Sequence, residues 1–182
     1  MTFVSTRLDS VRLAHYGPRK EYARMPTLVE QLGKEPQRPK VIADCVELVD
    51  AAVKQKGFVI KSAYATIKAI KRKFVPEVVD ALLDDWLGKL QPHYDKWVAA
   101  KTSTFTDYLV ARSDDVAEDL LSVTDARAQK TSHTTAKKMY LRMRDGAKKN
   151  VIESIPDLAK MIERQLAAPP PQPTAEQPTA SK

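Results

Sequence analysis

The stretch "VPEVVDALLDDWLGKL", residues 75–90, carries the broadest apolar stripe of the chain. Large apolar side chains recur in it at spacings of three and four residues, which is typical of a helix that buries one face. Pro76 stands near its start, where the missing proline N–H costs a helix least. The stretch therefore predicts an amphipathic helix on which other segments can pack. Its stripe comprises Val75, Val78, Val79, Leu82, Leu83, Trp86, Leu87 and Leu90.

The segments upstream of this helix show the same periodicity. One stripe runs from Val41 to Val53 and a second from Ile60 to Phe74. The chain has only five glycines, and it contains no alternating apolar and polar run bounded by turn residues. These patterns predict an all-α protein. The two stripes comprise Val41, Ile42, Cys45, Val46, Leu48, Val49, Ala52 and Val53, then Ile60, Ala63, Tyr64, Ile67, Ile70 and Phe74.

An internal repeat organises these helices. Residues 61–90 align without gaps on residues 137–166 at an offset of 76, with seven identities in thirty positions. "VIADCVELVDA" at 41–51 likewise matches "VAEDLLSVTDA" at 116–126. Chance gives about two identities in the longer alignment, although shared helical patterning raises that number. The identical pairs include Lys61/Lys137, Tyr64/Tyr140, Lys73/Lys149, Val75/Val151, Glu77/Glu153, Leu82/Leu158, Leu90/Leu166, Asp44/Asp119 and Asp50/Asp125.

The alignment predicts two tandem copies, residues 28–90 and 105–166, each with a short, a long, a basic and an acidic amphipathic helix. One copy alone would leave much of its apolar stripe in water. We therefore expect the copies to pack face to face about a pseudo-two-fold axis, in a compact domain of about seven to nine helices. Residues 91–104 would form a linker that also packs. Pro92 can start a short helix there, and Thr102, Ser103 and Thr104 can supply turn and capping oxygens.

Both ends of the chain differ from this helical part. A chain of 182 residues that is 43% hydrophobic can bury one core, which we place in a single domain over residues 27–166. Residues 1–26 form an extension, either flexible or translated from a mis-assigned start, because "MPTLVEQLG" from Met25 itself resembles a protein start. An Arg-rich targeting helix is the alternative. Residues 167–182 are rich in proline and lack large apolar side chains, so we expect a disordered tail.

Net charge, cysteine content and the length of apolar runs limit the kinds of partner and the cellular compartment that we expect. The net charge of +7 favours a polyanion or an anionic surface as partner. A single cysteine cannot form an internal disulfide, which favours a reducing compartment and a cytoplasmic protein. No apolar run approaches the roughly 20 residues of a transmembrane helix.

Several segments together resemble a known family. "TLVEQLGKEP", "VIADCVELVDAAV", "YLVARSDDVAEDLLSVTDARA" and "AKKMYLRMRDGAKKNVIESIP" stand in the order found in a family of small bacterial helical proteins known only as a domain of unknown function. The resemblance covers about residues 27–166. It implies an all-helical bacterial protein and brings no activity, cofactor or catalytic residue with it.

No residue set typical of catalysis or metal binding stands out. The three histidines, His15, His93 and His133, lie far apart in the sequence, and none has a second ligand at helical spacing. Cys45 lies on an apolar stripe, as a small core residue does. Asp84 and Asp85 lie on the polar side of their helix, and the scattered glycines form no phosphate-binding loop. We therefore expect no catalytic residue, metal or cofactor, and an interaction role rather than an enzyme.

Two repeated polar pairs have structural explanations. Tyr64 and Tyr140 lie on apolar helix faces, which indicates a core aromatic ring with its hydroxyl at the boundary. Glu77 and Glu153 stand near expected helix starts, where the helix dipole favours a carboxylate.

The basic helices are the strongest functional signal. "KSAYATIKAIKRKF" at 61–74 and its counterpart "KKMYLRMRDGAKKN" at 137–150 each carry a formal charge of +5. A repeated basic face suits a phosphate backbone, whereas acidic helices of the same domain could also neutralise it. The candidate polyanion-binding residues are Lys61, Lys68, Lys71, Arg72, Lys137, Arg142, Arg144 and Lys148.

Three functions are therefore compatible with the sequence. The first is a non-enzymatic module that binds nucleic acid or another polyanion through these two helices. The second is a scaffold for a protein partner, with the Pro-rich tail as an accessory. The third is a small-ligand-binding protein or enzyme with a pocket between the two copies, near Tyr64 and Tyr140.

Overall fold

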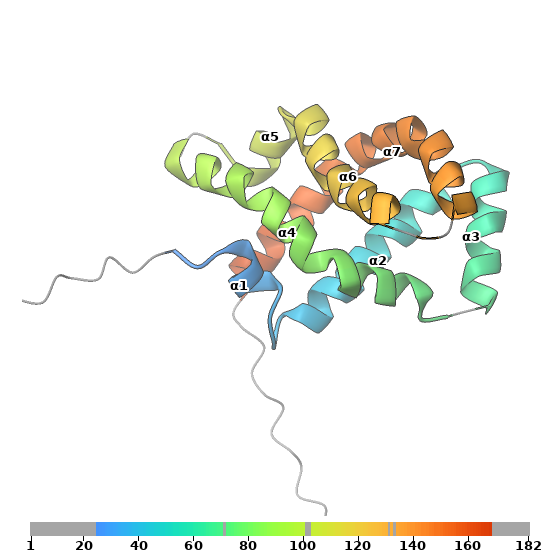
Figure 1. Cartoon of the computed structure of the whole chain (residues 1–182). Coiled ribbons are helices and arrows are strands. Elements are labelled where there is room, and N and C mark those ends of the chain that lie inside the picture. The colour runs from blue at the N-terminus through green and yellow to red at the C-terminus, as the bar shows by residue number, and fades with distance from the viewer. Residues whose placement is uncertain (1–24, 71, 101–102, 131, 133, 169–182) are drawn as a thin grey trace, which may run out of the picture.

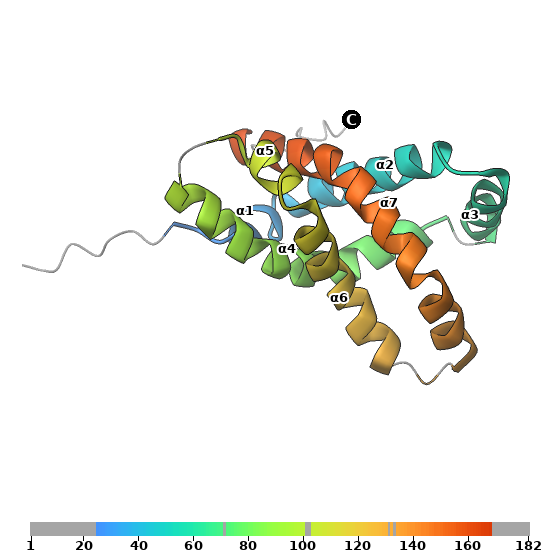
Figure 2. The same ribbon diagram turned by 90° about the horizontal axis from the view of Figure 1, so that it is seen from above.

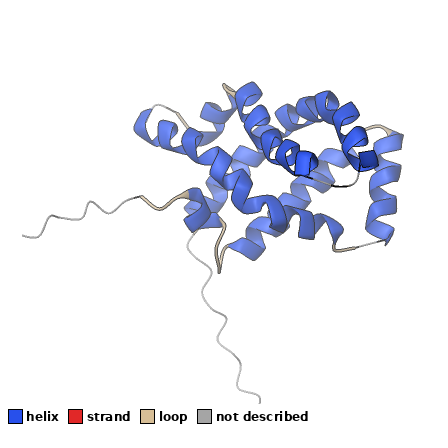
Figure 3. Cartoon of the chain, in the orientation of Figure 1, coloured by secondary structure: helices blue, strands red, loops and turns tan. Residues whose placement is uncertain are grey.

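The computed structural model describes residues 25–70, 72–100, 103–130, 132 and 134–168. Over these residues the chain forms helices joined by short turns, without a strand (Figure 3). The prediction of an all-α fold is confirmed. The helices are α1 (Leu28–Leu32), α2 (Arg38–Lys54), α3 (Phe58–Ile70), α4 (Phe74–Ala100), α5 (Phe105–Val110), α6 (Ser113–Lys130) and α7 (Thr134–Ala167).

The four long helices form a ring. Each packs mainly on two others, in the cyclic order α2, α4, α6 and α7. The short helices lie against the outside of this ring, α1 on α4 and α5 on α7. Figure 1 shows α4 crossing in front of α2 and below α6, and Figure 2 shows α2 and α7 running together along the other side. Helix α3 lies at one end and contacts only α2 and α4 extensively among the described elements.

The hydrophobic core joins the short helices to the ring. Phe105 and Leu109 of α5 are fully buried, as are Leu28 of α1 and Ile155 of α7. Tyr94 packs its ring edge-on against Phe105, with 5.7 Å between the ring centroids. The predicted stripe of residues 75–90 is buried at Val79, Leu82, Leu83, Leu87 and Leu90. Its members Val75 and Trp86 are half-buried, and Val78 is exposed, contrary to the prediction.

Side-chain caps determine where the short helices begin. Thr27 accepts a hydrogen bond from the Glu30 N–H, and Glu30 accepts one from the Thr27 N–H, which is a capping box. Thr104 caps α5 by accepting from the Asp107 N–H at 3.0 Å. The predicted capping role of Thr104 is therefore confirmed, whereas Thr102 lies outside the described residues.

Two predicted helix boundaries are wrong. Residues 91–100 continue α4 through Pro92 rather than forming a separate short helix, although Tyr94 and Trp97 pack as expected. The segments predicted as the basic and acidic helices of a second copy are one uninterrupted helix, α7, whereas those predicted for a first copy are the separate helices α3 and α4. Glu153 consequently lies inside α7 and not in a first turn, while Glu77 does lie in the first turn of α4.

Polar contacts join neighbouring helices at every side of the ring. Arg38 of α2 pairs with Asp80 of α4 at 2.7 Å. His93 of α4 lies 2.8 Å from Asp119 of α6. The α6–α7 side is joined by Arg144 and Glu118 at 2.6 Å, and the α7–α2 side by Gln165 and Asp44 at 2.5 Å. These contacts join each pair of adjacent helices, and the apolar faces of the helices are directed to the centre.

Candidate functional site

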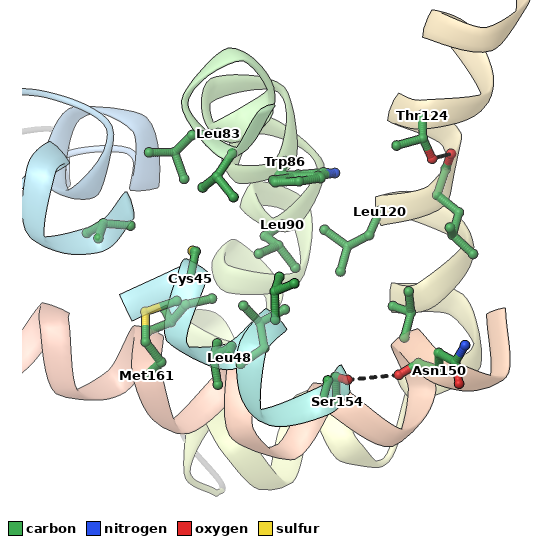
Figure 4. A pocket seen from close by; sticks show the side chains of 18 of the residues that line it. Cys45, Leu48, Leu83, Trp86, Leu90, Leu120, Thr124, Asn150, Ser154 and Met161 are labelled. Carbon is green, nitrogen blue, oxygen red and sulfur yellow. Dashed lines mark hydrogen bonds between the residues drawn. The ribbon is translucent and has the colours of Figure 1, made fainter. Parts of the chain in front are cut away.

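An apolar cavity of about 360 Å³ occupies the centre of the ring and opens to solvent. Figure 4 shows side chains of all four long helices converging on it, among them Leu48 of α2, Trp86 of α4 and Leu120 of α6. Val49 and Ile60 also line it and are 36% and 41% exposed, so they mark its mouth near α3. The cavity therefore lies between the predicted copies, although neither Tyr64 nor Tyr140 lines it.

The cavity explains why α2 is only partly buried. Its apolar stripe was expected to be a core face, yet only Val41 of that helix is fully buried. Cys45, Leu48 and Val53 line the cavity instead and are half-buried. The periodic pattern is the same for a helix face that packs on neighbours and for one that faces a cavity.

The polar side chains in the wall are mostly bonded to their own surroundings. Thr124 Oγ1 donates to the Leu121 carbonyl at 2.8 Å and lies 3.0 Å from the Tyr140 hydroxyl. Ser154 Oγ donates to the Asn150 carbonyl at 2.8 Å (Figure 4). The wall thus presents hydrocarbon almost throughout.

The single cysteine is part of this wall. Burial raises the pKa of the Cys45 thiol to about 12, with a smaller contribution from the neighbouring Asp44 carboxylate. The thiol is therefore protonated near neutral pH, and a protonated thiol is a poor nucleophile and metal ligand. This agrees with the expectation that Cys45 has a packing role.

Lys56 is the only charged side chain among the described residues that line the cavity. It follows α2 in the turn before α3, and its side chain is 19% exposed. Its Nζ lies 2.5 Å from Glu153 Oε2 of α7, whose side chain is 64% exposed. Asn150, which also lines the cavity, lies one helical turn from Glu153. A small polar rim therefore adjoins an apolar interior.

The candidate cations of the basic helices are partly engaged within the protein. Lys68 of α3 pairs with Asp50 of α2 at 3.0 Å, and the Tyr64 hydroxyl donates to the same carboxylate at 2.5 Å. The hydrogen bond from Tyr64 and, after it, the one from Lys68 lower the pKa of Asp50 despite partial burial.

An equivalent arrangement joins α7 to α6. The Tyr140 hydroxyl donates to Asp125 at 2.5 Å, and Arg144 donates to Asp125 at 2.9 Å and to Glu118 at 2.6 Å. The hydrogen bond from Arg144 lowers the pKa of Asp125, and the bond to Asp125 raises the pKa of Arg144. Lys148 pairs with Asp114 and Glu118, both at 2.9 Å.

The remaining candidates are more accessible. Lys61, Arg72 and Arg142 are exposed, Lys137 is half-buried, and Lys71 lies outside the described residues. Figures 1 and 2 place α3 and the first half of α7 toward the same end of the molecule, where they are not packed on each other. The exposed candidates Lys61 and Arg142 thus lie on two separate helices at this end of the molecule.

The histidines and acidic residues form no metal site within the described ranges. His93 is buried and bonded to Asp119, and His15 and His133 lie outside those ranges. Asp84 and Asp85 pair with Arg38 at 2.9 Å and with Arg127 at 3.5 Å. Among the helices of the described residues, none is long and apolar enough to cross a membrane.

Comparison with known proteins adds one finding. A family model described as "Family of unknown function (DUF6918)" matches residues 28–166. No curated protein and no solved structure matches the chain.

Proposed function

Because the chain belongs to this family of unknown function, which assigns it no activity, we propose from the cavity that the protein binds an apolar small molecule between α2, α4, α6 and α7. The observation that carries the proposal is an open cavity of about 360 Å³ with a hydrocarbon wall. Ligand pockets span roughly 300–1,000 Å³ and are mainly apolar, so the size and the lining agree. A polar wall would instead hold ordered water.

The arrangement of the four helices favours a cavity that is a regular feature of the fold over a local packing defect. Each adjacent pair of these helices is joined by an ion pair or by a hydrogen bond to a carboxylate, as at Arg38–Asp80 and His93–Asp119. The apolar side chains of the four helices face the open centre. Aliphatic side chains in that centre favour a ligand that is itself hydrocarbon.

A binding role fits the wall better than catalysis. Among the described residues that line the cavity, the ionisable side chains are those of Cys45 and Lys56. The raised pKa of Cys45 keeps its thiol protonated, and Lys56 is occupied by Glu153. A reaction needs a positioned acid, base or nucleophile facing the substrate, whereas retention of an apolar molecule needs only the wall.

Tryptophan fluorescence offers a direct test of the cavity. The chain has two tryptophans, of which Trp86 lines the cavity, so Trp97→Phe leaves one reporter. Neutral alkanols from hexanol to decanol should change the Trp86 emission saturably. The affinity should rise about fourfold for each added CH₂ until the cavity is full, because burying one CH₂ contributes about 0.8 kcal/mol.

Calorimetry on the unaltered chain provides the control for the Trp97→Phe substitution. It should show saturable binding with a negative heat-capacity change, the signature of apolar burial. Absence of saturable binding for every alkanol, by both methods, would reject the proposal.

Polyanion binding is the second candidate function. It is favoured by the net charge of +7 and by Lys61, Arg72 and Arg142, which are exposed and have no ion-pair partner within the described residues. Charge reversal at Arg72 and Arg142 should weaken binding to DNA, RNA or heparin, and binding should decrease steeply with salt. Binding that is absent or independent of salt would remove this candidate. A scaffold role that uses the Pro-rich tail stays a prediction, since residues 169–182 lie outside the described residues.

The two-copy organisation belongs to the same proposal. It is supported by Asp50, Tyr64 and Lys68, whose aligned positions Asp125, Tyr140 and Arg144 make the corresponding contacts. On this view α2 and α4 form one half of the ring and α6 and α7 the other, with the cavity at their junction.

A further inference from the structure

We propose that the ligand of the cavity is an anionic amphiphile, whose hydrocarbon chain enters the ring and whose anionic head binds Lys56. This inference rests on the proposed function and adds the chemical class of the ligand. Among the described residues that line the cavity, Lys56 carries the only charge, and no aspartate or glutamate is present. The interior therefore offers nothing to a cationic or a strongly polar group, and the rim offers one ammonium.

The position of Lys56 suits a head group at the mouth. Its side chain is 19% exposed, so the aliphatic stem covers apolar surface while the ammonium reaches the rim. It precedes α3, whose Ile60 lines the cavity and is 41% exposed. A chain lying in the cavity would thus end where the ammonium stands.

Glu153 acts as a replaceable counter-ion in this arrangement. Its carboxylate lies 2.5 Å from the Lys56 Nζ, but its side chain is 64% exposed and regains hydration on release. The less exposed ammonium of Lys56 needs an anionic partner whether or not a ligand is present. An anionic head can take the place of Glu153, whereas a neutral head leaves the ion pair intact and a cationic head meets repulsion.

Asn150 can assist the exchange. It lines the cavity one helical turn before Glu153, and its side-chain amide has no hydrogen-bond partner within the described residues. An amide N–H donates readily to a carboxylate or sulfate oxygen. The rim therefore offers one charge and one neutral donor, which matches a small anionic head on a single chain.

The test compares three ten-carbon ligands by calorimetry on the full chain. Decanoate should bind at least about fivefold more tightly than 1-decanol, because a charge-assisted hydrogen bond adds to the same apolar burial. Decyltrimethylammonium should bind more weakly than 1-decanol. In Lys56→Met the affinity for decanoate should fall to that for 1-decanol, and the 1-decanol affinity, which also reports correct folding, should change by less than about twofold.

Three further variants separate the charge of Lys56 from general electrostatics. Lys56→Arg should keep the preference for decanoate. Glu153→Gln should tighten decanoate by about two- to threefold, because the competing carboxylate is gone. Lys61→Met, which removes an exposed charge outside the cavity, should leave all three affinities unchanged.

The outcomes separate the two proposals. Equal affinities for decanoate and 1-decanol in the unaltered protein, or a preference that survives Lys56→Met, would overturn the anionic class while the cavity function stands. If none of the three ligands binds, the cavity function itself fails. A preference for decanoate that disappears in Lys56→Met supports both.

Discussion

Asp50 and Asp125 each bind a tyrosine hydroxyl and a cation that lie four residues apart on the neighbouring helix. Tyr64 and Lys68 approach Asp50, and Tyr140 and Arg144 approach Asp125. Spacing of four residues places two side chains on the same helix face, so a single carboxylate can accept from both. These contacts join α3 to α2 and α7 to α6.

Removal of the Asp125 charge should lower the stability of the protein. Asp125→Asn leaves the partly buried Arg144 with Glu118 alone, and we expect the free energy of unfolding to fall by about 1.5–3 kcal/mol. Asp50→Asn is the matched variant and should cost less, because Lys68 is 41% exposed whereas Arg144 is 19% exposed. Urea denaturation measures both values, and an equal or greater loss for Asp50→Asn would contradict this account.

Acid pH provides an independent control. The pKa of Asp125 is lowered below its ordinary value of 3.8, so the unfolded chain takes up protons first as the pH falls. The stabilisation is therefore complete above about pH 4 and disappears as the pH falls through the lower folded pKa. Asp125→Asn should show a smaller loss of stability over this range than the unaltered protein.

At this scale the sequence predicted which residues share a helix face but not which residues on other helices they contact. Helical spacing placed Tyr64 and Lys68 on α3, since spacing depends only on local geometry. Their partner Asp50 depends on how α2 and α3 meet, which periodicity does not encode. Of the two readings left open for the basic residues, neutralisation within the domain describes Lys68, Arg144 and Lys148, which are ion-paired, whereas Arg72 and Arg142 are exposed.

Helix continuity is the main difference between the two halves at the scale of elements. The first half divides into α3 and α4, whereas the aligned residues of the second half all belong to α7. Pro76 favours a break, because its ring would clash with the carbonyl of residue 72 in a continuous helix. A proline does not by itself force one, since Pro92 lies inside α4 and Pro156 inside α7. The aligned residue in α7 is Ile152, which permits the helix to continue.

Substituting each of these two residues by the other tests whether proline at this position decides helix continuity. Ile152→Pro should lower the free energy of unfolding by about 3 kcal/mol or more, because it removes a hydrogen bond inside α7 and introduces the clash. Pro76→Ile should change it by less than about 1 kcal/mol, since residue 76 lies in the first turn of α4. Thermal or urea denaturation followed by circular dichroism gives both values. A small effect of Ile152→Pro would show that α7 gains little from being continuous.

The sequence predicted the existence of the helices better than their ends. Their apolar stripes are local patterns, and α2, α3 and α4 follow them. The division of α7 into two helices was inferred by analogy with the first half, although Ile152 stands at the position aligned with Pro76. Pro92 was read as a helix start, yet α4 accommodates it internally.

The cavity is a property of the whole molecule. The stripe of α2 has the same spacing as a core stripe, so the sequence located its residues without revealing that they surround a space. Whether a stripe packs or lines a cavity depends on the ring order of α2, α4, α6 and α7, which arises from contacts between distant segments. The third functional hypothesis named a pocket near Tyr64 and Tyr140; neither ring lines this cavity, although the Tyr140 hydroxyl lies 3.0 Å from Thr124 in its wall.

Filling the cavity should separate ligand binding from stability. Ala52 lines the cavity and Ala51 beside it is exposed, so Ala52→Leu and Ala51→Leu change helix propensity equally at neighbouring positions of α2. Ala52→Leu should lower the affinity for 1-decanol by at least about tenfold and leave the free energy of unfolding unchanged or higher by up to about 1 kcal/mol. Calorimetry and urea denaturation measure the two effects.

Ala51→Leu should alter neither quantity appreciably. If Ala52→Leu binds 1-decanol as tightly as the unaltered protein, the ligand does not occupy the described cavity.

The position of Cys45 has a consequence for how occupancy of the cavity can be followed. The chain has one thiol, and it stands half-buried in the wall of a cavity that opens to solvent. A disulfide reagent can reach the thiol through the mouth, so a ligand that fills the cavity should slow the reaction. The protein therefore contains an intrinsic chemical label for access to its cavity, without the insertion of any foreign residue.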